Sequence, residues 1–261
     1  MPAEAEFYRR AGELLSEGRS FITAEVIEVR GSSPGEVGAK MIIHLGGETE
    51  FTIGGGAFEA EVIKDSLNLL REKARNRIKK YEFTEEKLGM YCTGSVRVLM
   101  EVHSPPPHLV IFGGGHIGQA LGNIAYHTGL FRITVIDDRE EYANSRVHPN
   151  IKEIILTDKD YSSNIPHIGD NSYVVIATRC HDTDRKVLKM VLANECPYVG
   201  MVGSMSKREK LIRQLMDEGV DPEALDGIHT PVGLPIGGKS PGEIAVSILA
   251  EIIKLINEKR G

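Results

Sequence analysis

Three glycines and an acid stand in an order that suits the binding of a phosphorylated ligand. The apolar run 109–112 leads into Gly113, Gly115 and Gly118, and a second apolar run ends at Asp137 about 20 residues later. Gly113 allows a tight turn, Gly115 lets backbone N–H groups approach a pyrophosphate at a helix N-terminus, and Gly118 lets that helix pack on the strand. Asp137 has the position of a ribose acceptor. The pattern predicts a Rossmann-type strand, turn, helix and strand.

Further polar residues follow other predicted strands, and in a parallel sheet such residues meet at one edge. Backbone donors, a hydroxyl and cations of this kind suit an anionic ligand that carries phosphate. Two alternatives stay open, because Lys207 also reads as a solvated helix residue and His181 as the cap of a helix. The candidate cofactor-binding set at this edge is Gly113, Gly114, Gly115, His116, Ile117, Gly118, Asp137, Asp138, Arg139, Thr178, Arg179, His181, Gly203, Ser204 and Lys207.

The N-terminal half carries two glycine-rich loops and one thiol of interest. Gly54, Gly55 and Gly56 run directly into a predicted helix that holds Glu59, and they read either as an anion-binding nest or as a tight turn. Lys40 ends the other loop, and we include it in the candidate set. Cys92 lies in a polar turn before a strand, where a thiol is either accessible or buried and inert.

Two further cysteines lie in the C-terminal half. Cys196 precedes a predicted strand and reads as a small buried hydrophobic residue. Cys180 reads either as an incidental substitution or as a second thiol that faces the crevice. Three scattered cysteines favour neither a disulfide framework nor a CxxC zinc site.

The run Ser104-Pro-Pro-Pro107 predicts the domain boundary, because consecutive prolines continue neither a helix nor a ladder. We therefore expect two domains, 1–104 and 105–261. The first combines helices at 4–17 and 58–73 with short strands and is of the α+β class. Its expected strands are 21–30, 41–45, 50–53, 77–83 and 95–103.

The second domain alternates strand-like and helix-like runs, which predicts an α/β fold with a doubly wound parallel sheet. Expected strands are 109–112, 133–136, 153–156, 173–177 and 198–202, and expected helices are 116–127, 182–193 and 206–218. A last helix starts at Ser240-Pro-Gly-Glu243, where the hydroxyl, the proline and the glutamate form a capping box.

The composition of the chain limits the classes of partner that we expect. The 261 residues are 41% hydrophobic and 26% charged, with a formal net charge of -6. No basic excess points to nucleic acid or an anionic membrane, and no run approaches the ~18 apolar residues of a membrane helix. The N-terminus lacks the pattern of a signal peptide, so we expect a cytoplasmic protein.

Both halves of the chain carry short motifs that together are typical of one known family. In the N-terminal half they are Gly31-Ser-Ser-Pro34, Gly38-Ala-Lys-Met41, Thr52-Ile-Gly-Gly-Gly56 with Glu59, and the turn at Cys92. In the C-terminal half they are Phe112-Gly-Gly-Gly-His116, Asp137-Asp-Arg139, Thr178-Arg179 with His181 and Asp184, Tyr198-Val-Gly-Met-Val-Gly-Ser204, and Pro231-Val-Gly-Leu234 through Ile244-Ala-Val-Ser247. With these motifs the chain resembles the XdhC/CoxI family of accessory proteins for xanthine dehydrogenase.

This resemblance implies a chaperone, rather than an enzyme, that binds the molybdenum cofactor, a pterin with a dithiolene and a terminal phosphate. Such a protein protects the cofactor during sulfuration and delivers it to an apo molybdenum hydroxylase. A cysteine desulfurase as partner and a homodimer are also implied. Cys92 would bind molybdenum or carry sulfur, which agrees with the thiophilic character of that metal.

The chain departs from the family pattern at a few positions. Gly35 stands where arginine is frequent, which removes a phosphate contact, and Thr93 replaces a glycine after Cys92. Ala57 stands where some members have cysteine, so Cys92 is the only thiol of the N-terminal half.

Two other functions compete with the chaperone. The glycine loop and Asp137 also fit an NAD(P)-dependent oxidoreductase, for which His116 and His181 are the available proton donors. A sensor that binds a dinucleotide without chemistry has the same loop. Turnover of a nicotinamide cofactor separates the enzyme from both alternatives.

Overall fold

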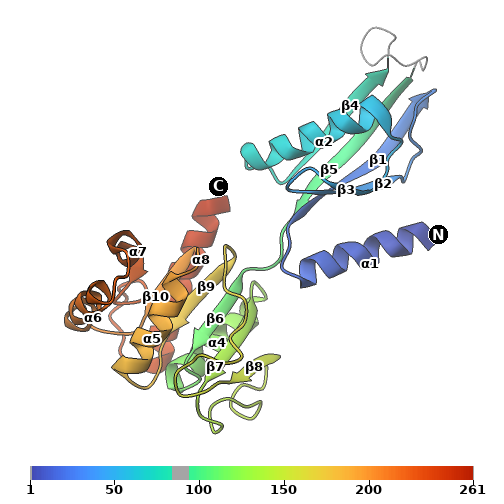
Figure 1. Ribbon diagram of the computed structural model, residues 1–261. Helices are drawn as coiled ribbons and strands as arrows, with labels where there is room; N and C mark the ends of the chain where they lie inside the picture. The colour runs from blue at the N-terminus through green and yellow to red at the C-terminus, as the bar shows by residue number, and fades with distance from the viewer. Residues whose placement is uncertain (1, 84–93, 261) are drawn as a thin grey trace. The chain divides into compact units, whose positions relative to one another are not determined.

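The computed structural model describes residues 2–83 and 94–260, and the chain forms two compact units, Met1–Pro105 and Pro106–Gly261 (Figure 1). The first is an α+β unit with an antiparallel sheet, and the second has a parallel six-stranded sheet with helices on both faces. The expected fold class is confirmed for both units.

The N-terminal unit is a five-stranded antiparallel sheet in the order β3-β2-β1-β5-β4. Helix α2 covers one face, where Phe58 and Val62 pack against alternate residues of β1 such as Ile22. Helix α1 covers the other face, where Leu14 packs with Phe21. The elements are α1 (Pro2–Ser16), β1 (Phe21–Gly31), β2 (Lys40–His44), β3 (Thr49–Phe51), α2 (Gly56–Arg71), β4 (Asn76–Phe83) and β5 (Gly94–His103).

The C-terminal unit is a parallel sheet in the order β11-β10-β9-β6-β7-β8. The chain first goes from β6 outward to β7 and β8 and then returns to β9 on the other side of β6. The elements are β6 (His108–Phe112), α4 (His116–Thr128), β7 (Arg132–Asp137), β8 (Glu153–Leu156), β9 (Ser172–Ile176), α5 (His181–Leu192), β10 (Tyr198–Met201), α6 (Met205–Asp217), α7 (Pro222–Asp226), β11 (Ile228–His229) and α8 (Pro241–Arg260).

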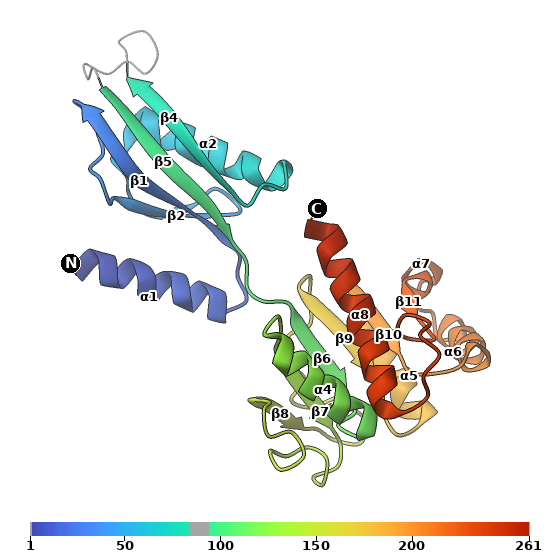
Figure 2. The ribbon, with the colours of Figure 1, turned by 180° about the vertical axis from the view of Figure 1, so that it is seen from behind.

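Both faces of this sheet are buried, so its central strands are continuous apolar runs. Helices α5 and α6 cover one face, where Val187 and Leu215 meet Phe112 of β6 in one core. Helices α4 and α8 lie side by side on the other face (Figure 2), where Leu121 and Ile248 share a core. The strand order reverses at β6, so the crevice of a doubly wound fold lies at the carboxyl end of β6 and its neighbours.

Element boundaries agree with the sequence pattern where capping is clear. The box at the start of α8 is confirmed, because the Ser240 amide donates to the Glu243 carboxylate at 3.0 Å and the Glu243 amide donates to the Ser240 hydroxyl at 3.3 Å. The strand expected at 50–53 runs instead over Thr49–Phe51 and stops where Phe51 turns to φ 66°. Elements α7 and β11 are too short to show a period in the sequence.

Candidate functional site

The glycine loop joins β6 to α4 and packs so tightly that side chains are excluded. Gly113 has φ 110°, and a Cβ there would collide with the carbonyl oxygen of Ala177 at the end of β9. A Cβ at Gly118 would collide with the carbonyl oxygen of Gly113. Gly118 therefore lets α4 begin directly against the turn, and the N-terminus of α4 lies at the crevice.

Part of this loop is already bonded within the protein. The Gly113 amide donates to the carbonyl of Ile136 at 2.8 Å, and the Gly114 amide donates to the Asp137 carboxylate at 2.8 Å. The first N–H groups of α4, over residues 116–118, have no acceptor within the helix. These groups are the donors that the loop can offer to a ligand.

Asp137 is fully buried and all its acceptor positions are used. Oδ1 accepts from the backbone amide of Arg139 at 3.0 Å and from Arg139 Nε at 2.9 Å. Oδ2 accepts from Gly114 and, at 2.9 Å, from Arg139 Nη2. A carboxylate has about four lone-pair positions, so in this conformation none is left for ribose hydroxyls. The hydrogen bonds that Arg139 donates to the Asp137 carboxylate raise the pKa of Arg139, whose guanidinium also lies 4.0 Å from the ring centroid of Tyr142.

Asp138 is buried beneath a second arginine. Its Oδ2 lies 2.8 Å from Arg179 Nη2, and Tyr161 donates a long hydrogen bond of 3.4 Å to Oδ1. Arg179 belongs to the loop after β9, whereas Asp138 follows β7. The structure thus joins two predicted site residues that lie far apart in the sequence.

The loops after β9 and β10 are joined by a buried acid. Asp184 Oδ1 accepts from the amide and the hydroxyl of Thr178 at 3.1 and 2.6 Å, and Asp184 Oδ2 accepts from Lys207 Nζ at 2.7 Å. Lys207 also donates to the carbonyl of Val202 at 3.1 Å. The Lys207 ammonium is therefore paired inside the protein rather than solvated.

Beside this cluster lies a pocket of about 370 Å³ at the N-termini of α5 and α6. Ser204 caps α6 by accepting from the Lys207 amide at 3.3 Å, while His181 is the first residue of α5 and is exposed. Gly203 packs close to the Lys207 side chain. The pocket brings together the candidates His181, Ser204 and Lys207.

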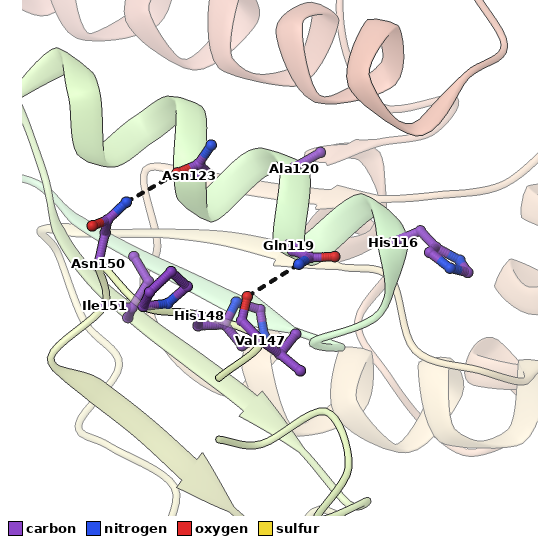
Figure 3. A pocket seen from close by; sticks show the side chains of 9 residues that line it. His116, Gln119, Ala120, Asn123, Val147, His148, Asn150 and Ile151 are labelled. Carbon is purple, nitrogen blue, oxygen red and sulfur yellow. Dashed lines mark hydrogen bonds between the residues drawn. The ribbon is translucent and has the colours of Figure 1, made fainter. Parts of the chain in front are cut away.

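A second pocket of about 330 Å³ lies between α4 and the loop after β7 (Figure 3). Two hydrogen bonds join its walls: Gln119 Nε2 donates to the carbonyl of Val147 at 3.1 Å, and Asn150 Nδ2 donates to Asn123 Oδ1 at 3.1 Å. Figure 3 shows His116 in the first turn of α4, apart from the other labelled side chains.

His148 connects this pocket to the glycine loop. The residue is buried, a Cβ on Gly114 would lie 3.0 Å from its Nε2, and this nitrogen has no hydrogen-bond partner among the described residues. Burial lowers the pKa of His148, although the neighbouring carbonyls of Gly114 and Tyr142 oppose this effect. His148 is a neutral ring that supports the loop.

In the N-terminal unit the glycine nest is filled by the chain itself. Glu59 Oε2 accepts from the Gly55 amide at 2.8 Å, the Ile53 amide at 3.3 Å and the Thr52 hydroxyl at 2.7 Å. A Cβ at Gly54 would collide with the carbonyl oxygen of Pro34, so the two glycine-rich loops touch.

Two candidate positions of this unit remain, Lys40 and Gly56, together with Gly35, which stands where the family often has arginine. Lys40 Nζ donates to Glu25 Oε1 at 2.8 Å, and although burial opposes it, this contact raises the Lys40 pKa. Gly35 has no room for a side chain, because a Cβ there would collide with the carbonyl oxygen of Ile53. Gly56, with φ 65°, begins α2.

Cys92 lies outside the described residues. Cys180 is exposed at the N-cap of α5, and the Thr183 hydroxyl beside it, 3.3 Å from the thiol, lowers the Cys180 pKa. Burial raises the pKa of Cys196 to about 11, consistent with an inert hydrophobic role.

Residues 2–83 and 94–260 contain no group of three or more His, Cys, Asp or Glu side chains suited to a metal ion. In the same residues every helix is too short or too polar to cross a bilayer.

Sequence reasoning did not single out several residues that shape the crevice. Tyr142, His148 and Tyr161 lie in irregular segments where no period marks a buried side chain. Asp184 appears in the sequence only as part of the family resemblance. Its burial between Thr178 and Lys207 becomes evident only when the ends of β9 and β10 are adjacent.

Two family models match the chain. The model described as XdhC Rossmann domain matches residues 109–252, and the model described as XdhC and CoxI family matches residues 3–82. The chain belongs to the XdhC and CoxI family.

Individual relatives agree with this placement. YqeB of Escherichia coli (strain K12), described as uncharacterized, is 31% identical over 265 residues, which cover 97% of this chain and 47% of YqeB. A Bacillus subtilis (strain 168) protein described as a probable subunit of xanthine dehydrogenase is 31% identical over 150 residues, which cover 58% of this chain and 43% of that protein. The chain spans less than half the length of these relatives.

A solved structure shares the fold. A crystal structure described as a xanthine dehydrogenase from Bacillus halodurans has 22% sequence identity and a TM-score of 0.53, over 94% of this chain and 95% of that one. At this identity the likeness concerns the fold alone.

Proposed function

We propose that this chain is an accessory protein that binds the molybdenum cofactor and delivers it to a xanthine dehydrogenase-type molybdenum hydroxylase. Family membership and the 31% identity to a probable component of a xanthine dehydrogenase support an accessory role. The cofactor, a pterin with a dithiolene and a terminal phosphate, is the cargo. The proposal includes the cytoplasm as the place of action and a homodimer as the acting form.

The buried state of Asp137 is the observation that favours this cargo over a nicotinamide dinucleotide. A dinucleotide site of the usual kind uses the acid after the second strand to accept ribose hydroxyls. Here both carboxylate oxygens of that acid, Asp137, already accept hydrogen bonds from Gly114 and Arg139. The crevice instead offers helix N–H groups and guanidinium groups, which suit the phosphate of a pterin cofactor.

In this proposal Cys92 is the residue that interacts with the molybdenum or with its sulfur ligand. It is the only cysteine of the N-terminal unit, and a thiolate is a suitable soft ligand for molybdenum. In the same proposal a cysteine desulfurase supplies the sulfur while the cofactor is bound. Cys92 then binds molybdenum or carries that sulfur to it.

Cofactor loading tests this proposal. The wild-type chain and Cys92→Ser are purified from a host that makes molybdenum cofactor, with Cys196→Ser as the matched control because Cys196 is half-buried and has no role in the proposal. Bound pterin is measured by oxidation and fluorescence, and molybdenum by mass spectrometry. We expect loading of wild type and Cys196→Ser, and loss of molybdenum or of sulfuration in Cys92→Ser.

Other results would change the conclusion in defined ways. Equal loading and equal activation of the client by Cys92→Ser would remove Cys92 from the mechanism. Absence of pterin from the wild-type chain would overturn the chaperone proposal.

The glycine loop supports one alternative, a nucleotide-binding protein. Turnover of a nicotinamide cofactor with small carbonyls or alcohols would identify an oxidoreductase. Thermal stabilisation by NAD without turnover would identify a sensor. We expect neither, because the ribose acceptor is occupied.

A further inference from the structure

The two acids at the end of β7 are buried beneath two arginines. The side chains of Asp137 and Asp138 are 0% and 2% exposed, whereas those of Arg139 and Arg179 are 23% and 44% exposed. Each carboxylate therefore acts as a counter-ion below the surface, and the guanidinium groups face outward. This edge of the crevice presents cations, although its sequence reads Asp-Asp.

The two arginines are held very differently. Arg139 makes two side-chain hydrogen bonds to Asp137, lies over the ring of Tyr142, and has its Nε 3.9 Å from Asp138 Oδ1. Within residues 2–83 and 94–260, the ion pair of Arg179 is a single one, from Nη2 to Asp138, and Arg179 is the more exposed of the two arginines. A guanidinium has five N–H donors, so most donors of Arg179 are unused in this contact. Arg139 is fixed, and Arg179 is the arginine that can change partner.

The sheet order places Arg179 across the crevice. Arg179 follows β9 and Asp138 follows β7, while β6 lies between these two strands. The ion pair must therefore pass over the carboxyl end of β6. The glycine loop and the first turn of α4 begin at this same end. A phosphate at this helix N-terminus would therefore lie at the same edge of the sheet as the Arg179–Asp138 pair.

We propose that the Arg179 guanidinium binds the phosphate of the ligand and exchanges between that phosphate and the Asp138 carboxylate. This inference rests on the proposed function for the identity of the cargo, but its chemistry concerns any phosphate or pyrophosphate ester. Ligand phosphate and Asp138 compete for one cation. Removing the cation and removing its counter-ion must therefore change affinity in opposite directions.

Calorimetric titration with inorganic pyrophosphate tests the exchange on the full-length chain. Arg179→Ala should weaken binding by roughly tenfold or more, the usual size of a lost charge-assisted hydrogen bond. Asp138→Asn should strengthen binding by roughly threefold or more, because it removes a competing negative charge nearby. In the double variant the gain from Asp138→Asn should disappear.

Arg185→Ala is the matched control. Arg185 also forms an ion pair with one carboxylate, that of Glu218, but it lies within α5 and its partner follows the C-terminus of α6. It should leave pyrophosphate affinity within about twofold of wild type. Thermal melting of every variant identifies any loss of folding.

Three results would overturn the inference. One is a wild-type chain that does not bind pyrophosphate at millimolar concentration. Another is an Arg179→Ala effect no larger than that of Arg185→Ala. The third is weaker binding in both Arg179→Ala and Asp138→Asn, since a merely structural ion pair would fail in that way. Pterin fluorescence measures cofactor loading in a separate experiment. Failure of the chaperone proposal is therefore distinguished from failure of the Arg179 exchange, which the pyrophosphate titration measures.

Discussion

Asp137 shows how one residue can have a recognisable position and a different task. Its location after the second strand is that of a ribose acceptor, yet its oxygens bind the Gly114 amide and hold Arg139 in place. Gly114 and Arg139 come from different loops, and one carboxylate fixes both. The acid therefore determines the conformation of the loop rather than contacting the ligand itself.

Asp137→Asn should lower the free energy of unfolding of the C-terminal unit by about 3 kcal/mol, because the change removes the buried carboxylate that accepts two side-chain hydrogen bonds from Arg139. Chemical denaturation measures the effect in the absence of ligand. Asp170→Asn is the control, since Asp170 is exposed, and it should shift stability by no more than about 0.5 kcal/mol. Equal stability of Asp137→Asn and wild type would show that the acid is not structural.

At the scale of elements, strands β6 and β7 are joined by their ladder and also by a chain of polar contacts that starts at the buried side chains of His108 and Thr134. His108 Nε2 lies 2.7 Å from the Thr134 hydroxyl, which donates to Glu153 at 2.8 Å. Glu153 in turn pairs with Arg132 at 2.9 Å. Since the Thr134 hydrogen goes to Glu153, His108 donates to Thr134 and its ring is fixed. Burial lowers the pKa of His108 to about 4.

This depressed pKa makes the stability of the C-terminal unit depend on pH. In the unfolded chain His108 takes up a proton near its ordinary pKa of ~6.5, whereas in the folded chain it does so only near 4. The stability that the neutral His108 contributes is complete above pH ~6.5. As the pH falls from there toward 4 this stability is lost, and the free energy of unfolding decreases by at most about 1.4 kcal/mol per pH unit.

Urea denaturation at several pH values measures this slope. His108→Gln does not titrate there, so the difference in slope between variant and wild type isolates the histidine from all other groups. Parallel stability curves for the two chains would contradict a buried neutral His108.

At the scale of the whole molecule, each of the two units has its own core. The core of the N-terminal unit lies between its sheet and helices α1 and α2, and the parallel sheet has one core on each face. Polypeptide units with separate cores fold separately in general.

The fragment 106–261 should therefore fold by itself, because both of its sheet faces are covered by its own helices. Circular dichroism should show mixed helix and strand content and a cooperative thermal transition. A fragment that is unfolded, or that melts without cooperativity, would show that the parallel sheet depends on residues 1–105.

The sequence alone was enough for features that depend on neighbours along the chain. Alternating apolar runs and glycine turns predicted the parallel sheet, and Ser240 with Glu243 predicted the start of α8, because these patterns reflect local backbone geometry. The glycine loop was recognised for the same reason. Short elements such as α7 carried too little pattern to be found.

The partners of the charged residues were decided only by the tertiary structure. Arg179 meets Asp138, Lys207 meets Asp184, and Glu59 fills a nest that the sequence offered to a ligand. Which charges remain exposed depends on which strand ends are adjacent, and strand order is not a property of local sequence. Burial then strongly favours pairing, because an unpaired buried charge is costly. The sequence thus determined where the crevice lies, and the fold decided that arginines rather than acids face it.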